Sequence, residues 1–507
     1  MKLRPLPSEL VRAQQKIEQY AREFGLTFFR TVFEMVDYEQ MNALAAYGGF
    51  PTRYPHYRFG MEYQQLSKSY EYGLHKIYEM VINNDPTYAY LLVGNTLLDQ
   101  KLVMAHVYGH ADFFLNNMYF AHTNRKMIDE MANHATRIRR YQDRFGIEVV
   151  ERFIDACLAI DDLIDPGSVF SSGEPRPADS TTTDEDDGIS VKRMPAKSYM
   201  DRYVNPPEFL EEQRKRLEEQ QEERRKHFPA TPERDVLGFV MEQAPLENWE
   251  RDILSMIREE AYYFLPQRQS KVMNEGWASY WHSRIMTTKV LSDAEVIDYA
   301  DHHSGTVATQ PGRLNPYKLG LELFRDIERR WDCGQFGPEW DDCEDMAKRR
   351  SWDRQLGLGR QKIFEVRKVH CDATFLDEFL TPEFCAEQQL FVNKEASQPH
   401  PRGGQLISSR EFNEIKQALL FQFTNGGRPV VELIDANHDN RSELLLEHRH
   451  VGIDLRWDWA GDVLANLAQI WRRPVVLETT RGGKRIRLNH DGDSRSEKLI
   501  DKTAQAS

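Results

Sequence analysis

The feature that most constrains the fold is a polar stretch, SSGEPRPADSTTTDEDDGIS, at residues 171–190. It is rich in Ser, Thr, Pro and acidic residues and has almost no large apolar side chain, so it cannot contribute to a hydrophobic core. We therefore expect residues 166–195 to form an exposed, disordered linker. The folded parts of this 507-residue chain must be built from the segments on either side.

The segments that flank the linker have the periodicity of helices. In residues 1–165, apolar residues recur at spacings of three and four through YEYGLHKIYEMVINN, LLDQKLVMAHVYGHADFFLNN and VVERFIDACLAIDDLID. Residues 196–355 continue the pattern, and PPEFLEEQRKRLEEQQEERRKHFP pairs opposite charges as a solvated helix does. Pro266 should end or kink a later helix, because its ring clashes with the preceding turn. We predict that these two segments pack together as one helical domain.

The pattern changes to that of β-strands beyond about residue 360. Alternating or β-branched runs occur in KIFEVRKV, ALLFQF, PVVELIDAN, SELLLEHRH and PVVLETTRGGKRIRL, and TNGGR is a hairpin turn signal. The helix-like DWAGDVLANLAQIW lies among them. We predict a smaller C-terminal α/β domain at residues 356–495, a disordered tail at residues 496–507 and an α+β fold class overall.

Composition excludes several classes of protein. The net charge of −14 argues against a general nucleic-acid binder, which needs clustered, uncompensated Lys and Arg. The five cysteines are scattered and never form a CxxC pair, so neither a disulfide framework nor a thiolate zinc site is indicated. No segment has the apolar length of a signal peptide or a membrane span. We expect a soluble, cytoplasmic protein that binds neither nucleic acid nor membrane.

Two histidines have the spacing of metal ligands. His106 and His110, in HVYGH, are four residues apart, so on a helix their side chains lie on one face. Imidazole nitrogens suit zinc and related divalent ions, and a carboxylate from another helix commonly completes such a site. Glu275, in MNEGWASYWH, is our candidate for the third ligand, because a buried charge among aromatic residues needs compensation.

The run NEGWASY is similar to the helix of gluzincin aminopeptidases that begins with Asn-Glu-Gly-aromatic and supplies the carboxylate ligand to zinc. The resemblance implies a gluzincin-like helical region. In those enzymes the histidines belong to HExxH, whose glutamate is the general base, whereas Val107 stands at that position here. Glu260, in REEAYYFLPQ, is the predicted acid/base, and Glu259 and Asp112 are alternatives.

Further histidines are candidates for direct roles. His282 follows Glu275 by almost two helical turns, so the two lie on one face about 10 Å apart along the axis. We predict that His282 is a catalytic or substrate-contacting residue, with orientation of a ligand or a second metal as alternatives. His302 and His303, in a segment that contains several Gly and Pro residues, are further candidates. Each histidine has a structural alternative, since buried histidines also serve as hydrogen-bonded core residues.

Five ordered motifs carry a wider resemblance: VYGHADFFLNN, EEAYYFLPQ, MNEGWASYWH, HHSGTVATQPGRLNPYKLG and KIFEVRKV. Together they resemble the SpoVR family, the stage V sporulation protein R-like proteins, over nearly the whole chain. The resemblance implies a bacterial or archaeal cytoplasmic protein, linked to spore cortex formation in spore formers and to stress or stationary-phase physiology elsewhere. It also implies two partners, a PrkA-like serine protein kinase and a von Willebrand A-domain protein.

Two functions are compatible with these patterns. The first is a metal-dependent hydrolase that acts on an amide bond through a zinc or other divalent ion held by His106, His110 and Glu275. The second is a non-catalytic regulatory or scaffold protein that works with the kinase, in which the same cluster is a structural metal site or a polar core.

Overall fold

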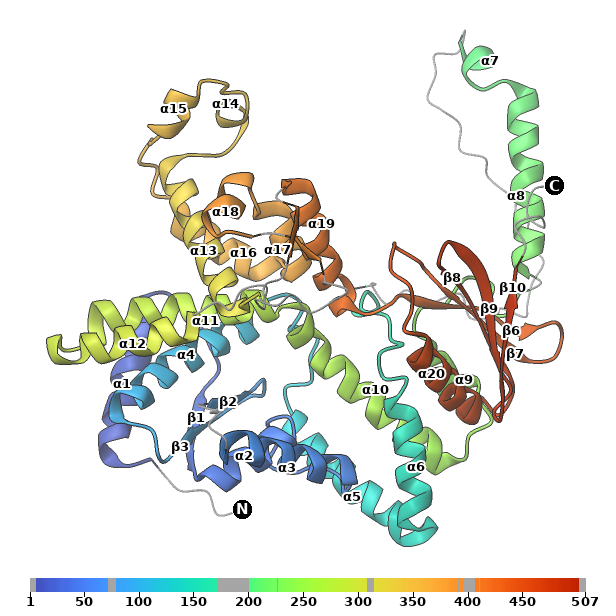
Figure 1. The fold of residues 1–507 in the computed structure, drawn as a ribbon, viewed down its shortest axis with the longest axis horizontal. Helices are drawn as coiled ribbons and strands as arrows, with labels where there is room; N and C mark the ends of the chain where they lie inside the picture. Colours follow the sequence, from blue (N-terminus) through green and yellow to red (C-terminus); the bar gives the residue numbers. More distant parts are fainter. Residues whose placement is uncertain are drawn as a thin grey trace. The chain divides into compact units, whose positions relative to one another are not determined.

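The computed structural model describes residues 6–71, 79–170, 200–225, 227–307, 314–390, 392–394, 406–409 and 411–500 (Figure 1). Most of the predicted linker, residues 171–195, and residues 501–507 of the predicted tail lie outside the described residues. The chain divides into two compact units. Unit 1 comprises Met1–Ile147 and Tyr262–Gly427, and unit 2 comprises Glu148–Ala261 and Arg428–Ser507.

Unit 1 is mainly helical. Its long helices are α1 (Ser8–Glu23), α2 (Tyr38–Ala46), α3 (Tyr57–Glu71), α4 (Leu97–Asn116), α5 (Met127–Phe145), α11 (Lys271–Ile285), α12 (Val296–Val307), α13 (Pro316–Cys333), α16 (Gly359–Val369), α17 (Asp372–Phe379) and α19 (Phe412–Phe423). Its short helical segments are η1 (Met286–Val290), η2 (Asp293–Glu295), α14 (Pro338–Asp341), α15 (Met346–Arg350), α18 (Pro382–Glu387) and η3 (Thr424–Gly427).

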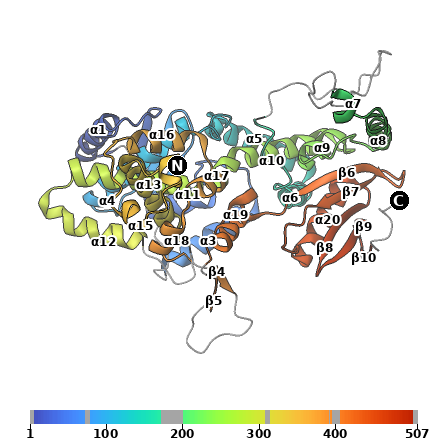
Figure 2. The same ribbon diagram turned by 90° about the horizontal axis from the view of Figure 1, so that it is seen from above.

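Helices α4 and α11 form the centre of unit 1 and lie side by side, with α13 against the other side of α11 (Figures 1 and 2). Most residues of both helices are buried, although α11 carries polar and charged side chains among its aromatic ones. The start of α4 is fixed by a capping box: the Thr96 hydroxyl accepts from the Asp99 N–H, and the Asp99 carboxylate accepts from the Thr96 N–H. The predicted helix at residues 97–117 is confirmed.

A small sheet in unit 1 was not predicted. Strands β1 (Thr31–Val36), β3 (Thr87–Leu92) and β2 (Glu79–Ile82) pair in that order, β1 parallel and β2 antiparallel to β3. The helical prediction for YEYGLHKIYEMVINN is therefore wrong at β2, while residues 72–78 lie outside the described residues. A short continuous apolar run such as MVI, residues 80–82, fits a buried strand as well as a helix, and pairing with β3 decides between them.

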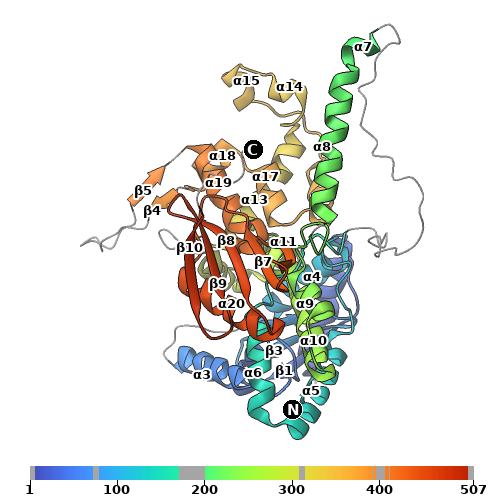
Figure 3. The same ribbon diagram turned by 90° about the vertical axis from the view of Figure 1, so that its right-hand side faces the viewer.

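Unit 2 contains the C-terminal sheet. Strands β6 (Val431–His438), β7 (Glu443–His448), β8 (Val475–Arg481), β9 (Lys484–His490) and β10 (Arg495–Leu499) form a mixed five-stranded sheet in the order β10-β9-β8-β7-β6 (Figure 3). Helix α20 (Trp457–Trp471) packs on β8 and β9. The remaining helices that begin in or enter this unit are α6 (Ile147–Leu158), α7 (Asp201–Val204), α8 (Pro207–Arg225), α9 (Val236–Gln243) and α10 (Asn248–Gln269). The predictions of a C-terminal sheet and of the helix at α20 are confirmed.

Two predicted strands are helices. KIFEVRKV lies in α16 and ALLFQF lies in α19. In α16, Ile363 and Val366 are both buried, which is the spacing of one helical face, so burial overrides the β-branched composition. Between α16 and α19 in the sequence, β4 (Val392–Lys394) pairs with β5 (Leu406–Ser409).

Pro266 does not end its helix. Helix α10 continues through Pro266 to Gln269, and the Ser270 hydroxyl then donates to the Pro266 carbonyl oxygen over 2.7 Å. The next helix, α11, begins at Lys271. Among the described residues, no helix is long and apolar enough to cross a membrane.

Candidate metal centre

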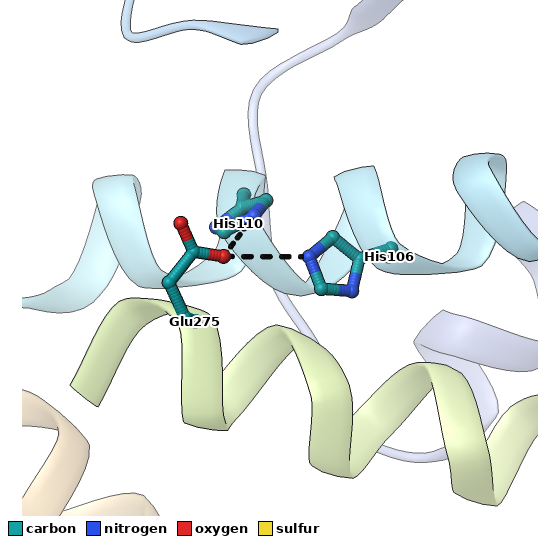
Figure 4. A group of neighbouring side chains, drawn as sticks. All are labelled: His106, His110 and Glu275. Atoms are coloured by element: carbon teal, nitrogen blue, oxygen red, sulfur yellow. Dashed lines mark ion pairs between the residues drawn. The ribbon is translucent and has the colours of Figure 1, made fainter. Parts of the chain in front are cut away.

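The HVYGH and NEGWASYWH motifs lie on adjacent helices of unit 1. His106 and His110 project from α4 toward Glu275 on α11 (Figure 4). The Nε2 atom of His106 is 3.7 Å from Oε2 of Glu275, and Nε2 of His110 is 3.5 Å from the same oxygen. The structure therefore brings together all three ligands predicted from the sequence.

These separations fit a shared ion better than hydrogen bonds. Two donor atoms bound to one zinc ion at about 2.1 Å, with tetrahedral angles, lie roughly 3.4 Å apart. The ligand atoms of the three residues all lie within 4.8 Å of one another. Two imidazoles and one carboxylate are also a donor set that zinc commonly takes.

Burial makes the arrangement costly without a cation. Both ligand histidines are 4% exposed, and among the described residues Oε2 of Glu275 accepts no hydrogen bond. Burial lowers the pKa of His110 to about 4, with the nearby His106 adding to the shift, so the ring is neutral at pH 7. Burial acts to raise the pKa of Glu275, but neighbouring groups that include Lys271 outweigh it and hold this pKa below its ordinary value. A charged carboxylate thus faces two imidazoles inside the protein.

The residue before Glu275 orients His110. Oδ1 of Asn274 lies 2.9 Å from Nδ1 of His110. A neutral imidazole carries one proton, so with Nδ1 donating to Asn274 the Nε2 atom of His110 has a lone pair facing Glu275. The His110 nitrogen that faces the carboxylate is therefore itself an electron-pair donor.

The second histidine also has a partner on α11. Nδ1 of His106 lies 2.8 Å from Nδ1 of His282, which is 2% exposed. The ring of Tyr317, from the first turn of α13, is stacked near His106 at 6.3 Å between ring centroids. His282 thus contacts a predicted metal ligand rather than joining the ligand group.

Glycines allow the close approach of these helices. A Cβ atom at Gly109, between the two ligand histidines, would lie 2.6 Å from Cα of Ala278 on α11. A Cβ atom at Gly276, directly after Glu275, would overlap the backbone of Gly320 on α13. Small residues therefore bring α4 and α13 against opposite sides of α11. All three glycines lie inside the motifs quoted from the sequence, but no local pattern marks them as contacts between helices.

A carboxylate from another helix fixes the start of α11. The two oxygens of Asp372, the first residue of α17, accept from the N–H groups of Val272 and Met273 at 2.8 Å each. The N-terminal N–H groups of a helix need such partners when they are buried. This contact holds the first turn of α11, immediately before Asn274 and Glu275. Asp372 was also missed, because nothing local in its sequence marks a cap for a distant helix.

Comparison with known proteins identifies the family. The family described as SpoVR like protein matches residues 6–428, which is most of the chain. The chain belongs to the SpoVR family. It is 27% identical over 493 residues to the uncharacterized protein YcgB of Escherichia coli strain K12, and the alignment covers 91% of this chain and 90% of the relative. No solved structure matches this SpoVR-family chain.

The other candidate residues of this SpoVR-family chain have different positions. Glu260 is buried in α10 and belongs to unit 2, as does Glu259. Asp112 is held in an ion pair with Arg367 and accepts further hydrogen bonds, so it is not available as a base. The segment that contains His302 and His303 is the end of α12, and their side chains lie outside those that the structure describes.

Proposed function

We propose that this SpoVR-family chain binds one divalent metal ion, zinc by its donor set, through His106, His110 and Glu275. The observation that carries the proposal is the pair formed by Nε2 of His110 and Oε2 of Glu275, 3.5 Å apart. Both atoms present lone pairs, and the hydrogen bond to Asn274 places the His110 proton on the other side of its ring. A cation between them offsets both their repulsion and the cost of burying the carboxylate.

The donor set favours a catalytic use of the ion. Three protein ligands leave a coordination position open, which is typical of catalytic zinc sites, whereas structural sites have four. Zinc in such a site acts as a Lewis acid and makes a bound water acidic enough to be a nucleophile near neutral pH. We propose hydrolysis of an amide bond, in a peptide or cell-wall precursor, because of the gluzincin-like NEGW helix and the family's association with the spore cortex.

The residue at position 107 cannot be the general base of this reaction, so another side chain must transfer the proton. Val107 is completely buried and has no ionisable group. The role of Glu260 as the acid/base remains a prediction from the sequence, and a folded Glu260→Gln variant that retains hydrolysis would contradict it.

Metal content is the test of the site. Tag-free protein purified without chelators should contain close to one equivalent of zinc or another divalent ion, measured by inductively coupled plasma mass spectrometry. His110→Ala and Glu275→Gln should both lose it, because each removes one of only three ligands. His122→Ala and Glu9→Gln change the same residue types at exposed positions of unit 1 and should retain the metal.

Circular dichroism and unfolding curves show whether each variant is folded. Folded parent protein that remains metal-free after incubation with zinc, cobalt(II) or manganese(II) overturns the proposal. Metal that persists in both folded ligand variants assigns it to another site and also overturns it.

The second candidate function is non-catalytic, and the buried Val107 favours it. In this case the ion stabilises unit 1, and the protein acts with a PrkA-like kinase and a von Willebrand A-domain protein in sporulation or stress physiology. Cobalt(II)-substituted protein separates the two functions. An open coordination position predicts that a hydroxamate or azide shifts the cobalt absorption bands, whereas a closed structural site predicts no shift.

A further inference from the structure

We propose that Asn274 and His282 are positioning residues that hold His110 and His106 with their Nε2 atoms toward the metal. The inference rests on the proposed metal site and adds the groups that prepare the ligands. It follows from the chemistry of imidazole: a neutral ring has one proton, so a ring that binds metal through Nε2 must carry its proton on Nδ1. A hydrogen-bond acceptor at Nδ1 fixes that tautomer and the orientation of the ring.

Asn274 provides the acceptor for His110. Its Oδ1 atom is 2.9 Å from Nδ1, on the side of the ring away from Glu275. An amide oxygen can only accept, so it selects the tautomer whose Nε2 carries a lone pair rather than a proton. Because Asn274 and Glu275 are adjacent on α11, one turn of helix supplies both a ligand and the group that orients another ligand.

His282 provides the acceptor for His106. Only one proton can lie between the two Nδ1 atoms, which are 2.8 Å apart. When His106 binds metal through Nε2, His106 must donate this proton and His282 must accept it. In the opposite tautomer, Nε2 of His106 carries a proton and cannot be a ligand. His282 therefore determines whether His106 is competent to bind.

The two contacts are related by the packing of the helices. His110, the later of the two histidines on α4, contacts Asn274, the earlier residue on α11. His106 contacts the later residue, His282, so the two helices are antiparallel at the site. The close approach of Gly109 to Ala278 lies between the two contacts. This register explains why the ligand and both positioning residues occur within one short motif, MNEGWASYWH.

Variants of matched shape test the inference. Leucine resembles asparagine in size but accepts no hydrogen bond, so Asn274→Leu and His282→Leu should each weaken zinc binding by roughly 10–100-fold. Asparagine can place its Oδ1 near the position of a histidine Nδ1, so His282→Asn should restore most of the affinity. Asn274→Asp keeps an acceptor at position 274 and should likewise bind tightly. Affinities are measured on the full-length protein by competition with a chromophoric chelator.

Two readouts separate positioning from a structural role. Cobalt(II) absorption should change in shape in the leucine variants at saturating cobalt, because a misoriented imidazole alters the ligand field. A residue with only a structural role would lower the unfolding midpoint of the metal-free protein and leave both the affinity and the cobalt spectrum of the folded fraction unchanged.

The outcomes also separate this inference from the proposed function. Tight binding by the parent and by both folded leucine variants, within twofold of one another, overturns the positioning roles and leaves the metal site intact. Equal losses in His282→Leu and His282→Asn overturn the role of His282 as an acceptor. Absence of metal binding by the parent overturns the proposed function and the inference with it.

Discussion

Two carboxylates on the adjacent helices α4 and α11, Asp112 fully buried and Glu275 partly buried, have opposite surroundings. Asp112, on α4, pairs with the Arg367 guanidinium at 2.9 Å and accepts from the Trp277 indole N–H at 2.8 Å. Its other oxygen accepts from the Thr27 backbone N–H at 2.8 Å. Glu275, on α11, faces two imidazole nitrogens instead, and its Oε2 accepts no hydrogen bond from the described residues.

The difference is the one expected between a structural ion pair and a site that binds a cation. The protein supplies a cation and three N–H donors, from Trp277, Thr27 and Asn116, to Asp112, and this group needs nothing from solution. Burial still raises the pKa of Asp112 to about 6, with Arg367 opposing the shift. At Glu275 the chain supplies electron-pair donors around a negative charge and no fixed cation beside them at hydrogen-bonding distance among the described residues. That is the arrangement expected where a cation is to be taken from solution.

The largest predicted effect is on the satisfied carboxylate. Arg367→Ala leaves the Asp112 charge buried without its partner and should lower the free energy of unfolding by about 3–5 kcal/mol. The loss should be the same with zinc or with EDTA, because this pair takes no part in metal binding. Urea unfolding followed by tryptophan fluorescence measures it. Arg325→Ala, which breaks an exposed pair with Glu322, is the control and should cost less than about 1 kcal/mol.

A loss of similar size in Arg325→Ala, or one that depends on zinc, would contradict the distinction between the two carboxylates. In the first case the buried ion pair would contribute no more to the free energy of unfolding than an exposed one. In the second case the Asp112–Arg367 pair would be coupled to metal binding at Glu275.

The next effect is specific to metal. Glu275→Gln should abolish the stabilisation that zinc gives the parent, about 2.7 kcal/mol at a free concentration one hundred times the Kd. In EDTA the variant should be at least as stable as the parent, since it removes a buried charge and keeps the shape of the side chain. Thermal unfolding with zinc and with EDTA checks both statements. A zinc-dependent rise in Tm that survives in the variant would show that Glu275 is not a ligand.

The three candidate ligands could be selected from the sequence because their signals are local. Two histidines at i,i+4 share a helix face in any context, and NEGW resembles a known carboxylate-bearing helix. The convergence of the two motifs is not local. It depends on Gly109 meeting Ala278 and on Asp372 fixing the start of α11, and both are contacts between segments far apart in the chain.

Contacts between distant segments also explain the errors in the predicted secondary structure. The strands from β6 to β9 alternate or are β-branched between clear turn residues, and their prediction is confirmed. In KIFEVRKV, however, three β-branched residues favour a strand, while burial of Ile363 and Val366 against the helical core makes it part of α16. Propensity spans only about 1 kcal/mol, so tertiary burial decides the structure of such short segments.

A smaller effect tests whether helix spacing connects packing to the site. Gly276→Ala places a methyl group against the backbone of Gly320, so α11 and α13 must move apart. We expect a loss of about 1–3 kcal/mol in the free energy of unfolding and weaker zinc binding, because Glu275 precedes the contact. The control is Gly60→Ala in α3, where a Cβ atom meets nothing within 4 Å. A loss in the control equal to that in Gly276→Ala would assign the effect to glycine itself rather than to packing.

The smallest effect concerns a third carboxylate, that of Asp372. It accepts hydrogen bonds from the N–H groups of Val272 and Met273. Burial raises the pKa of Asp372 to about 7, and the charge of Glu275 adds to the shift. The folded protein therefore holds a proton on Asp372, between its ordinary pKa of 3.8 and about 7, that the unfolded chain has released. Its contribution to stability is present at the acidic end of this window and falls as the pH rises through it.

Asp372→Asn removes this titration and keeps one acceptor for the start of α11. The stability of the parent minus that of the variant should decrease from pH 5 to pH 8, by on the order of 1 kcal/mol per pH unit within the window. Urea midpoints at four pH values in EDTA measure the difference. If the urea midpoints of the parent and of Asp372→Asn change with pH in parallel, Asp372 remains ionised over the whole pH range. The N–H groups of Val272 and Met273 would then satisfy a buried carboxylate as fully as Arg367 satisfies Asp112, and a lack of hydrogen bonds, rather than of a fixed cation, would distinguish Glu275.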